Sequence, residues 1–547
     1  MDPQRAEEIH PDTKDQTEHV ELTKGDLAPA LKSNFDELGL LATAWKFRKA
    51  VMVSTLMCVA AACDGYQINL NGNIIANSGF TRQVGFKNSK GVYVLNANNT
   101  ALWGALQSLG QLVGMLALNP ISDKIGRKYT LYALWLILAV SLIIETTVRT
   151  ANEWAAAKFL AGMGVGAIQS TMPIYITEWA PPNIRGAMIT AYAFWNNLGG
   201  FLAPLLLYLT GKGNQLNFRV PIYTQWAFLG VMLPIFIYLP ETAQYFAARD
   251  QDEKGIATLR RVNGYIDGYS PEAEYAIVKN IIIEERALRA ELGLDQRMGW
   301  KETMRSYAAC FDKDNWRRTL GSTLPACMQQ LVGLAFLNNY ASLFFKQSGF
   351  ANAFLITTII TGIKMVAIII LSVTTDKTGR RPTVLGAAVI CTLSMLIVGI
   401  MGQVHSTSGV KAGLIFVACV WSMANSVLGS LGWTFVGEVA AQRLRARTAG
   451  IAAGGSVLFG LTFNTALPKI LDVNGANWGY NTAWLFLGTG IVACIMGYLF
   501  VPETARRNAA ELDELFDRGV PAWRMRSFDT DVQKTQQGQI KAREMEN

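Results

Sequence analysis

The sequence carries little charge. Asp, Glu, Lys and Arg make up 16% of its 547 residues, whereas soluble proteins usually carry about 25%. Apolar residues make up 51%, and they gather in runs of roughly 18–25, long enough to cross a lipid bilayer as a helix. This composition excludes an ordinary soluble globular protein. We therefore expect an all-α membrane protein whose surroundings are the lipid bilayer.

Residues typical of catalytic and metal sites are also scarce. The three His residues are scattered, and most of the seven Cys residues lie inside apolar runs without a Cys-x-x-Cys or Cys/His spacing. No nucleophile–base set or nucleotide-binding loop is present. The basic residues behind the net charge of +8 lie mostly in loops between apolar runs, whereas a nucleic-acid-binding protein would cluster them on one face. From the sequence we expect neither enzymatic activity nor a bound metal, cofactor or nucleic acid.

Three charged motifs occur twice, in the same order. They are the run Asp-Lys-Ile-Gly-Arg-Lys at 123–128, the pair Glu178 and Arg185, and Pro-Glu-Thr-Ala at 240–243. Each returns about 250 to 260 residues later, as the run at 376–381, the pair Glu438 and Arg445, and Pro-Glu-Thr-Ala at 502–505. Three motifs at nearly one offset indicate an internal duplication.

The apolar runs divide into two sets of six. We expect spans near 47–71, 101–119, 129–148, 154–177, 187–209 and 223–240, and again near 319–345, 352–375, 383–402, 412–437, 447–468 and 481–501. The domains are then an N-terminal tail (1–46), a first half (47–240), a helical loop (241–317), a second half (318–501) and a C-terminal tail (502–547). Because basic residues gather in the loops on one side, we expect that side, the helical loop and both termini to be cytoplasmic.

The motifs, together with Gln-Gln-Leu-Val-Gly at 329–333, resemble those of the sugar-porter family of the major facilitator superfamily. Within that family they resemble fungal hexose and related sugar transporters. The resemblance covers about residues 45–510. It implies two parallel halves with a substrate site between them at the middle of the membrane. It also implies alternating-access transport of a small-molecule sugar, a hexose or a relative, across the plasma membrane.

The resemblance assigns Gln329 and Gln330 to sugar binding. Amides suit a sugar because each offers a donor and an acceptor without charge. The further substrate-binding candidates are Asn339, Asn425, Trp433 and Asn196. Hydrogen bonds between helices for the amides, and a place at the membrane interface for the Trp, remain the alternatives.

The charged motifs are expected to form a gate at the cytoplasmic ends of the spans. A network of ion pairs there biases an equilibrium between open and closed states. The gating candidates are Asp123, Arg127, Lys128, Glu178, Arg185 and Glu241 in the first half, and Asp376, Arg380, Glu438, Arg445 and Glu503 in the second. The alternative is that the basic residues only set the topology.

Proton coupling depends on a carboxylate in the first span. Coupled members of the family have an acid where this chain has Gln67, and Asp64 lies three residues earlier. Lys158 occupies the position of the family's basic residue in the fourth span, so we expect Asp64 and Lys158 to pair. Proton symport and a static pair with facilitated diffusion are both left open.

Several residues depart from the family pattern. Ala193 and Ala335 replace amides, and Lys364 lies about 18 Å along a helix from Asp376, deep in the membrane. Lys364 either faces the cavity, where it recognises an acidic solute, or is buried against a carbonyl group. The alternatives to a hexose transporter are a carrier of another polyhydroxylated or acidic solute or of a fungal metabolite, and a transporter-like sugar sensor.

The stretch from Asn71 to Asn98 is expected to be a polar outer loop. It ends in Asn98-Asn99-Thr100, which fits the acceptor pattern for N-glycosylation. We therefore name Asn98 as a glycosylation candidate next to the second span.

Overall fold

The computed structural model describes residues 39–531 except 89–90, 214–215, 292–303, 306, 314, 406, 441–443, 473–475, 506, 508 and 529. In that part of the chain, ten helices are long and apolar enough to cross a membrane. Of the N-terminal tail expected over residues 1–46, residues 1–38 lie outside the described part of the chain.

The first half contains six spans. Their helices are α2 (Arg48–Ile74), α4 (Ala97–Ile125), α5 (Arg127–Thr147), α6 (Ala151–Trp179), α7 (Arg185–Gly213), and α8 with α9 (Arg219–Tyr223 and Gln225–Tyr238). Smaller elements flank them: α1 (Leu40–Lys46), α3 (Ser78–Val84), β1 (Phe86–Lys87), β2 (Tyr93–Val94) and η1 (Pro182–Ile184).

The second half repeats this plan. Its spans are α14, η3 and α15 (Trp316–Leu331, Ala335–Asn339 and Ala341–Gln347), α16 (Ala353–Thr378), α17 (Arg380–Met401), α18 (Ser408–Val439), α19 (Arg445–Leu471), and α20 (Thr482–Phe500), which follows η5 (Gly479–Asn481). Between the halves lie α10 (Ala243–Ala247), α11 (Asp252–Asn263), α12 (Pro271–Glu291) and η2 (Ala309–Phe311). The C-terminal segment contains α21 (Ala509–Asp517) and η6 (Met525–Ser527).

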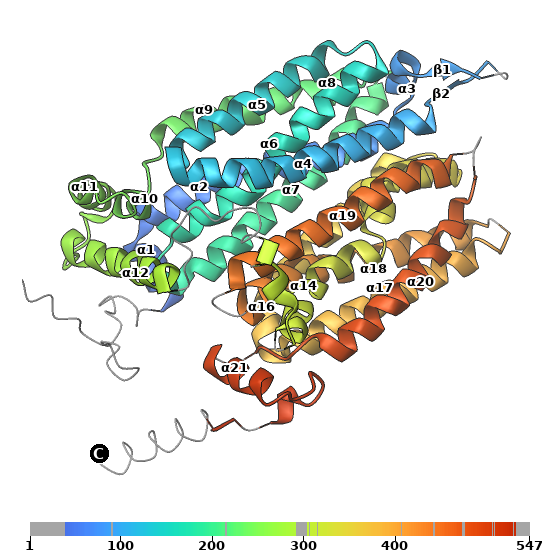
Figure 1. The fold of residues 1–547 in the computed structure, drawn as a ribbon. Coiled ribbons are helices and arrows are strands. Elements are labelled where there is room, and N and C mark those ends of the chain that lie inside the picture. Colours follow the sequence, from blue (N-terminus) through green and yellow to red (C-terminus); the bar gives the residue numbers. More distant parts are fainter. Residues whose placement is uncertain are drawn as a thin grey trace, which may run out of the picture.

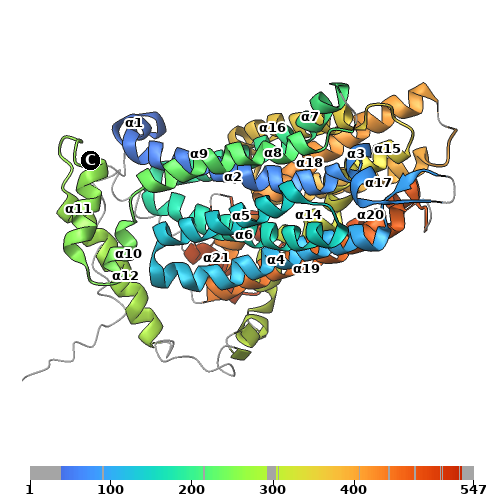
Figure 2. The same cartoon turned by 90° about the horizontal axis from the view of Figure 1, so that it is seen from above.

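The two halves lie side by side as two helical bundles (Figure 1). Helices α10, α11 and α12 lie at one end of the bundles, and α3 with the short antiparallel hairpin of β1 and β2 lies at the other (Figures 1 and 2). We call these the α12 end and the hairpin end. The architecture is all-α in its spans, with six spanning elements in each half, as the predicted fold class requires.

The stretch from Asn71 to Asn98 is more ordered than expected. Helix α2 runs on to Ile74, and Asn71 is buried. The Asn77 side chain caps α3 by accepting hydrogen bonds from the backbone N–H groups of Gly79 and Phe80. Phe80 then packs with its ring against Trp103, Trp154 and Phe218. The expectation of a simple polar loop was wrong because one apolar residue anchors the segment.

The seventh span, expected as one helix over 319–345, is interrupted. Helix α14 ends at Leu331, Gly333 has φ +97°, and a π-helical turn, η3, follows before α15. This positive φ favours glycine, and a side chain there would also require the end of the Met395 side chain, 2.7 Å away, to move. Breaks of this kind occur at membrane depth where the backbone lines a site inside the protein.

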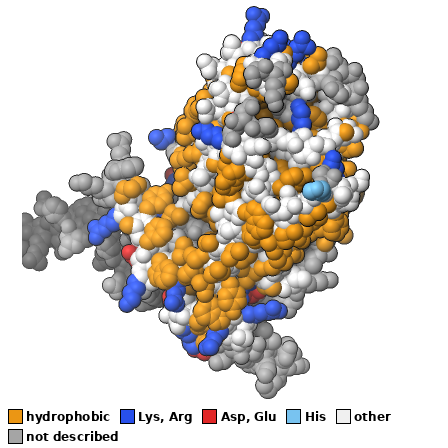
Figure 3. Space-filling view, turned by 90° about the vertical axis from the view of Figure 1, so that its right-hand side faces the viewer, with side chains coloured by type: hydrophobic (Ala, Val, Ile, Leu, Met, Phe, Trp, Pro, Cys, Tyr) orange, Lys and Arg blue, Asp and Glu red, His pale blue; other side chains and the backbone are white. Residues whose placement is uncertain are grey.

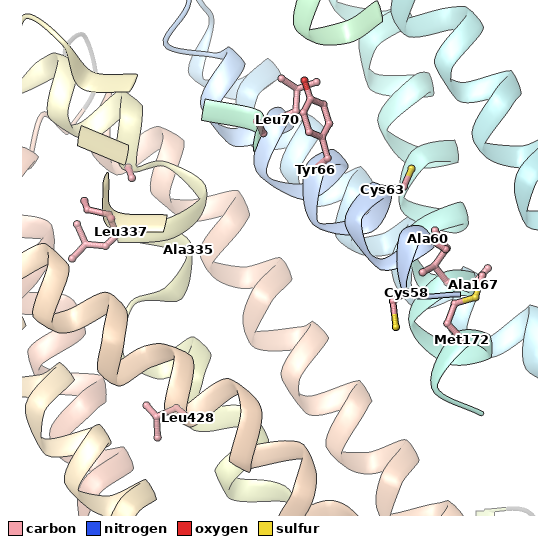
Figure 4. Close-up of a cluster of buried hydrophobic side chains, with 14 of the residues drawn as sticks. Cys58, Ala60, Cys63, Tyr66, Leu70, Ala167, Met172, Ala335, Leu337 and Leu428 are labelled. Carbon is pink, nitrogen blue, oxygen red and sulfur yellow. The ribbon is translucent and has the colours of Figure 1, made fainter. Parts of the chain in front are cut away.

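The surface and the interior have the distribution expected of a bundle in lipid. Large apolar side chains such as Leu116 (64% exposed) and Phe416 (69%) cover the outside of the spans, and Figure 3 shows a broad hydrophobic face with few charges. Inside, small and apolar side chains from both halves are buried, among them Cys58 and Tyr66 of α2 and Leu428 of α18 (Figure 4). Lipid therefore covers the outer face, and the polar groups described next lie between the helices.

Candidate functional site

A glycine turn and a carboxylate form a clamp at the α12 end of the first half. Gly126, with φ +102°, turns the chain from α4 into α5, and a side chain there would meet Glu241 Oε2 at 2.4 Å. The Glu241 carboxylate accepts hydrogen bonds from the backbone N–H groups of Arg127 (3.1 Å) and Lys128 (3.0 Å). A carboxylate at a helix N-terminus satisfies free N–H groups and the positive end of the helix dipole.

The second half contains the same clamp. Gly379 has φ +90°, and a side chain there would meet Glu503 Oε2 at 2.9 Å. The Glu503 carboxylate accepts hydrogen bonds from the backbone N–H groups of Arg380 (3.0 Å) and Arg381 (3.4 Å). The two motif pairs that indicated a duplication therefore build one structural unit twice.

Burial and hydrogen bonding act in opposite directions on Glu241, which lies outside the spanning helices. Burial raises the pKa of its carboxyl above the ordinary value. The backbone N–H donors and the charge of Arg127 oppose that rise in pKa. Glu241 also lines a groove of about 360 Å³ with Lys128, Lys254 and Arg261.

The arginines of the clamps form ion pairs inside each half. Arg127 contacts Asp123 (2.6 Å) and Glu178 (3.3 Å), and Arg380 contacts Glu438. Arg185 forms no ion pair with the described residues. The side chains of Asp376 and Arg445 lie outside the described part.

The hydrogen bonds between the two halves lie toward the hairpin end. Asn338 donates to Asn69 (3.4 Å), Ser342 to Asn73 (2.6 Å), and Lys346 to the backbone of Ala76 (2.7 Å). Gly72 permits this approach, since a side chain there would meet the backbone oxygen of Asn339 at 1.8 Å. Among the described residues no ion pair joins the halves, at either end. These hydrogen bonds therefore join the halves toward the hairpin end.

Amides gather beside the broken seventh span. The Gln329 side chain donates to Asn425 Oδ1 (3.3 Å), and Asn425 donates back to the backbone of Gln329 (3.4 Å). Gln330 points toward α19, since a side chain at Gly460 would lie 3.4 Å from its Nε2 atom. Its amide forms no hydrogen bond with the described protein, and it is partly buried.

Trp433 lies outside this amide cluster. Gly429, against which the Gln329 amide packs, precedes Trp433 by one helical turn, so the two share a face of α18. The Trp433 side chain is 46% exposed. It lies one turn nearer the α12 end than Gly429.

A second amide group joins the halves. Asn339 donates to Asn464 Oδ1 (3.1 Å), and Asn464 donates to Ser108 Oγ of the first half (3.2 Å). Asn338 donates to Asn339 Oδ1 (3.1 Å), and Lys364 donates to Asn338 Oδ1 (3.4 Å). These uncharged groups have the chemistry that binds hydroxyls.

The predicted ion pair between Asp64 and Lys158 is wrong. Asp64 accepts hydrogen bonds from Gln169 (3.1 Å) and Asn196 (2.9 Å) instead, so Asn196 is a partner of Asp64. Among the described residues Asp64 has no cation partner.

Lys158 pairs with Glu145, at 2.9 Å, and both side chains are fully buried. Gln67 (2.5 Å) and Gln225 (3.0 Å) also donate to Glu145, and the Lys158 ammonium lies 4.3 Å from the centre of the Trp154 ring. The Lys158 ammonium thus points toward the third span, α5, and Gln67 donates a hydrogen bond to the same Glu145 carboxylate.

Sequence reasoning missed several of these residues. Glu145 lies two residues from the end of α5, where an acid is read as an ordinary helix-end charge. Gln169, Asn69 and Asn464 are polar residues in apolar runs, and that signal was available. No cluster of His, Cys, Asp or Glu that would hold a metal occurs in the described residues.

Asn98 is exposed in the first turn of α4. Thr100 of the same acceptor pattern is buried and donates its hydroxyl to the backbone of Asn96 (3.2 Å). Glycosylation of Asn98 stays a prediction.

A family model described as "Sugar (and other) transporter" matches residues 53–516. The chain belongs to this sugar transporter family. The match spans both halves and all the charged motifs, and members of the family are transporters rather than enzymes.

Curated relatives share about a quarter of their residues with the chain. The major facilitator-type transporter ecdD of Aspergillus rugulosus is 26% identical, with 87% of this chain and 88% of the relative covered. The hexose transporter HXT9 of Saccharomyces cerevisiae is also 26% identical, with 86% and 84% covered. The high glucose sensor RGT2 of the same yeast is 26% identical, but the match covers only 53% of its length.

Solved structures confirm the fold. The inward-open xylose transporter XylE from E. coli matches with a TM-score of 0.66 at 19% identity, over 85% of this chain and 99% of that one. A peptide transporter, POT, matches with a TM-score of 0.54 at 14% identity, over 82% and 92%.

We expect the buried pair of Glu145 and Lys158 to dominate the stability of the first half. Glu145→Gln leaves a buried ammonium without a counter-charge, and Lys158→Met leaves a buried carboxylate, so each should cost about 3–5 kcal/mol. Thermal unfolding of the detergent-solubilised protein measures the loss as a fall in melting temperature. The double variant Glu145→Met/Lys158→Met should recover most of it.

The exposed pair of Arg260 and Glu272 is the matched control. Arg260→Gln should change stability by less than about 1 kcal/mol. Equal losses at the two pairs, or a double variant no better than the single ones, would contradict a tightly coupled buried pair.

Proposed function

We propose that this protein carries a sugar or a closely related polyhydroxylated solute across the plasma membrane by alternating access. The observation that carries the proposal is the set of uncharged amides where the two halves meet beside the broken seventh span. Gln330 has no hydrogen bond to the described protein and lies against Gly460 of α19. Asn464 follows Gly460 by one helical turn and accepts a hydrogen bond from Asn339. The relatives named as hexose and glucose transporters support a hexose-sized substrate.

The bonds between the halves support an arrangement that is closed at the hairpin end. Transport then requires that these bonds break while the α12 end closes. We assign the gate to the two clamps and their arginines, since each clamp ties the start of one helix to the end of another within its half. Each half then moves as a unit.

The α12 end is proposed to be cytoplasmic, with both chain termini on that side. Basic residues of the motif loops gather there, among them Lys124, Arg127 and Lys128 beside α4 and α5. Loops rich in Lys and Arg stay on the cytoplasmic side.

Coupling to protons is assigned to Asp64. Its carboxylate lies at membrane depth with amide partners and no cation among the described residues. Such a group is able to exchange a proton when the site opens to water, whereas Glu145 is locked in its pair with Lys158.

Uptake by liposomes that contain the purified full-length protein tests this function. We expect uptake of one or more labelled monosaccharides from a panel of hexoses, pentoses and sugar acids. Gln330→Ala should raise the KM about tenfold, because one or two hydrogen bonds of about 0.5–1.5 kcal/mol each are lost. Gln403→Ala, whose amide binds Asn481 at the hairpin end, should leave KM unchanged.

A protonophore in the same assay decides the coupling. We expect accumulation to collapse with the protonophore and in Asp64→Asn, while sugar exchange across the membrane persists. Uptake that ignores the protonophore would mean facilitated diffusion. No uptake of any sugar in the panel would contradict the proposed function.

A further inference from the structure

Lys364 is a charged residue at membrane depth that lacks a charged partner among the described residues. It lies near the middle of α16, eleven residues after Ala353 and fourteen before Thr378. Its Nζ atom donates one long hydrogen bond, 3.4 Å, to Asn338 Oδ1. A lysine ammonium has three donors, so most of its capacity is unused.

Lys158 shows how the same protein treats a structural lysine. That ammonium is fully buried, lies 2.9 Å from a carboxylate, and faces the Trp154 ring. Among the described residues, no acidic side chain lies within 4.0 Å of the Lys364 ammonium. A structural role would be expected to provide Lys364 with a similar partner.

Lys364 points toward the broken seventh span rather than lipid, because its ammonium donates to Asn338. Helix α16 also lies against the first half at this level, since a side chain at Gly362 would lie 3.3 Å from the Phe201 ring of α7. Asn338 belongs to the broken span and donates to Asn69 of the first half. The ammonium thus lies beside the amides assigned to hydroxyl binding.

We propose that Lys364 binds a carboxylate group of the transported solute, so that the preferred substrate is a sugar acid rather than a neutral sugar. This inference rests on the proposed function of the same site. A cation surrounded by neutral amides complements a molecule with several hydroxyls and one carboxylate. The desolvation cost of the ammonium is then offset when the substrate binds.

An alternative role for Lys364 is an ion pair with Asp64 in another state of the cycle. The two residues belong to opposite halves, and Asp64 is held here by Gln169 and Asn196. In that case Lys364 would affect neutral and acidic sugars equally, whereas a carboxylate-binding lysine affects only the acid.

Glucose and glucuronate are matched probes, because they differ only in the oxidation of one terminal carbon. Binding of each to the purified full-length protein is measured by competition against a labelled sugar. We expect glucuronate to bind at least tenfold more tightly than glucose. Lys364→Gln should remove that preference and leave the affinity for glucose within about twofold. Lys364→Arg should keep that preference. The control Lys411→Gln, at the start of α18 where the lysine binds the backbone of Gly349, should match the wild type.

The outcomes separate this inference from the proposed function. Glucose binding that equals or exceeds glucuronate binding overturns the carboxylate site and leaves sugar transport standing. If Lys364→Gln weakens the binding of both sugars equally, and adding Asp64→Asn restores that binding, the carboxylate site is overturned in favour of the ion pair with Asp64. Binding of neither sugar, with no uptake of any sugar in the panel, overturns the proposed function and this inference with it.

Discussion

The hydrocarbon core of a membrane offers no water to hydrogen-bond an amide or to solvate a charge, so each polar group at that depth needs a partner inside the protein. Most of the interior of this protein follows from that constraint. The fully buried pair of Glu145 and Lys158 receives further hydrogen bonds from Gln67 and Gln225. Asp64 is held by two amides. Gln330 and Lys364, whose donors are largely unused by the described protein, lie beside the broken seventh span.

The duplicated clamps show how the same constraint shapes the ends of the helices. A turn with positive φ at Gly126 or Gly379 brings a helix N-terminus against the carboxylate of Glu241 or Glu503. The ion pairs of Arg127 and Arg380 then join further helices of the same half. Because the bonds between the halves lie toward the hairpin end, the halves are built to move as two bodies around the amides between them.

The repeated motifs allowed the fold to be predicted from the sequence. An offset shared by three charged motifs indicates duplication, and the apolar runs place the spans. The clamp residues were also found, because glycine, arginine and glutamate stand in fixed order around each turn. The partner of Lys158 was not found, since the rotation of one helix against another depends on packing across the bundle. Glu145 lies only two residues before the end of α5, and nothing in the sequence places it against Lys158.

The break in the seventh span was likewise hidden in an apolar run. Gly333 marks it only in retrospect, because its positive φ and its contact with Met395 depend on the neighbouring helix. The same holds for Phe80, which turned an expected loop into an ordered segment. Sequence patterns place residues along a helix, whereas contacts between helices decide which of them meet.

Distances between spin labels at the two ends test most directly whether the halves alternate around the site. One pair joins Gln83 and Gln347 at the hairpin end, and the other joins Lys124 and Gly437 at the α12 end. Gly72→Val places a side chain against the backbone oxygen of Asn339 and should prevent closure of the hairpin end. Alternating access predicts that this variant lengthens the first distance and shortens the second. Unchanged distances, or two distances that change in the same direction, would contradict it.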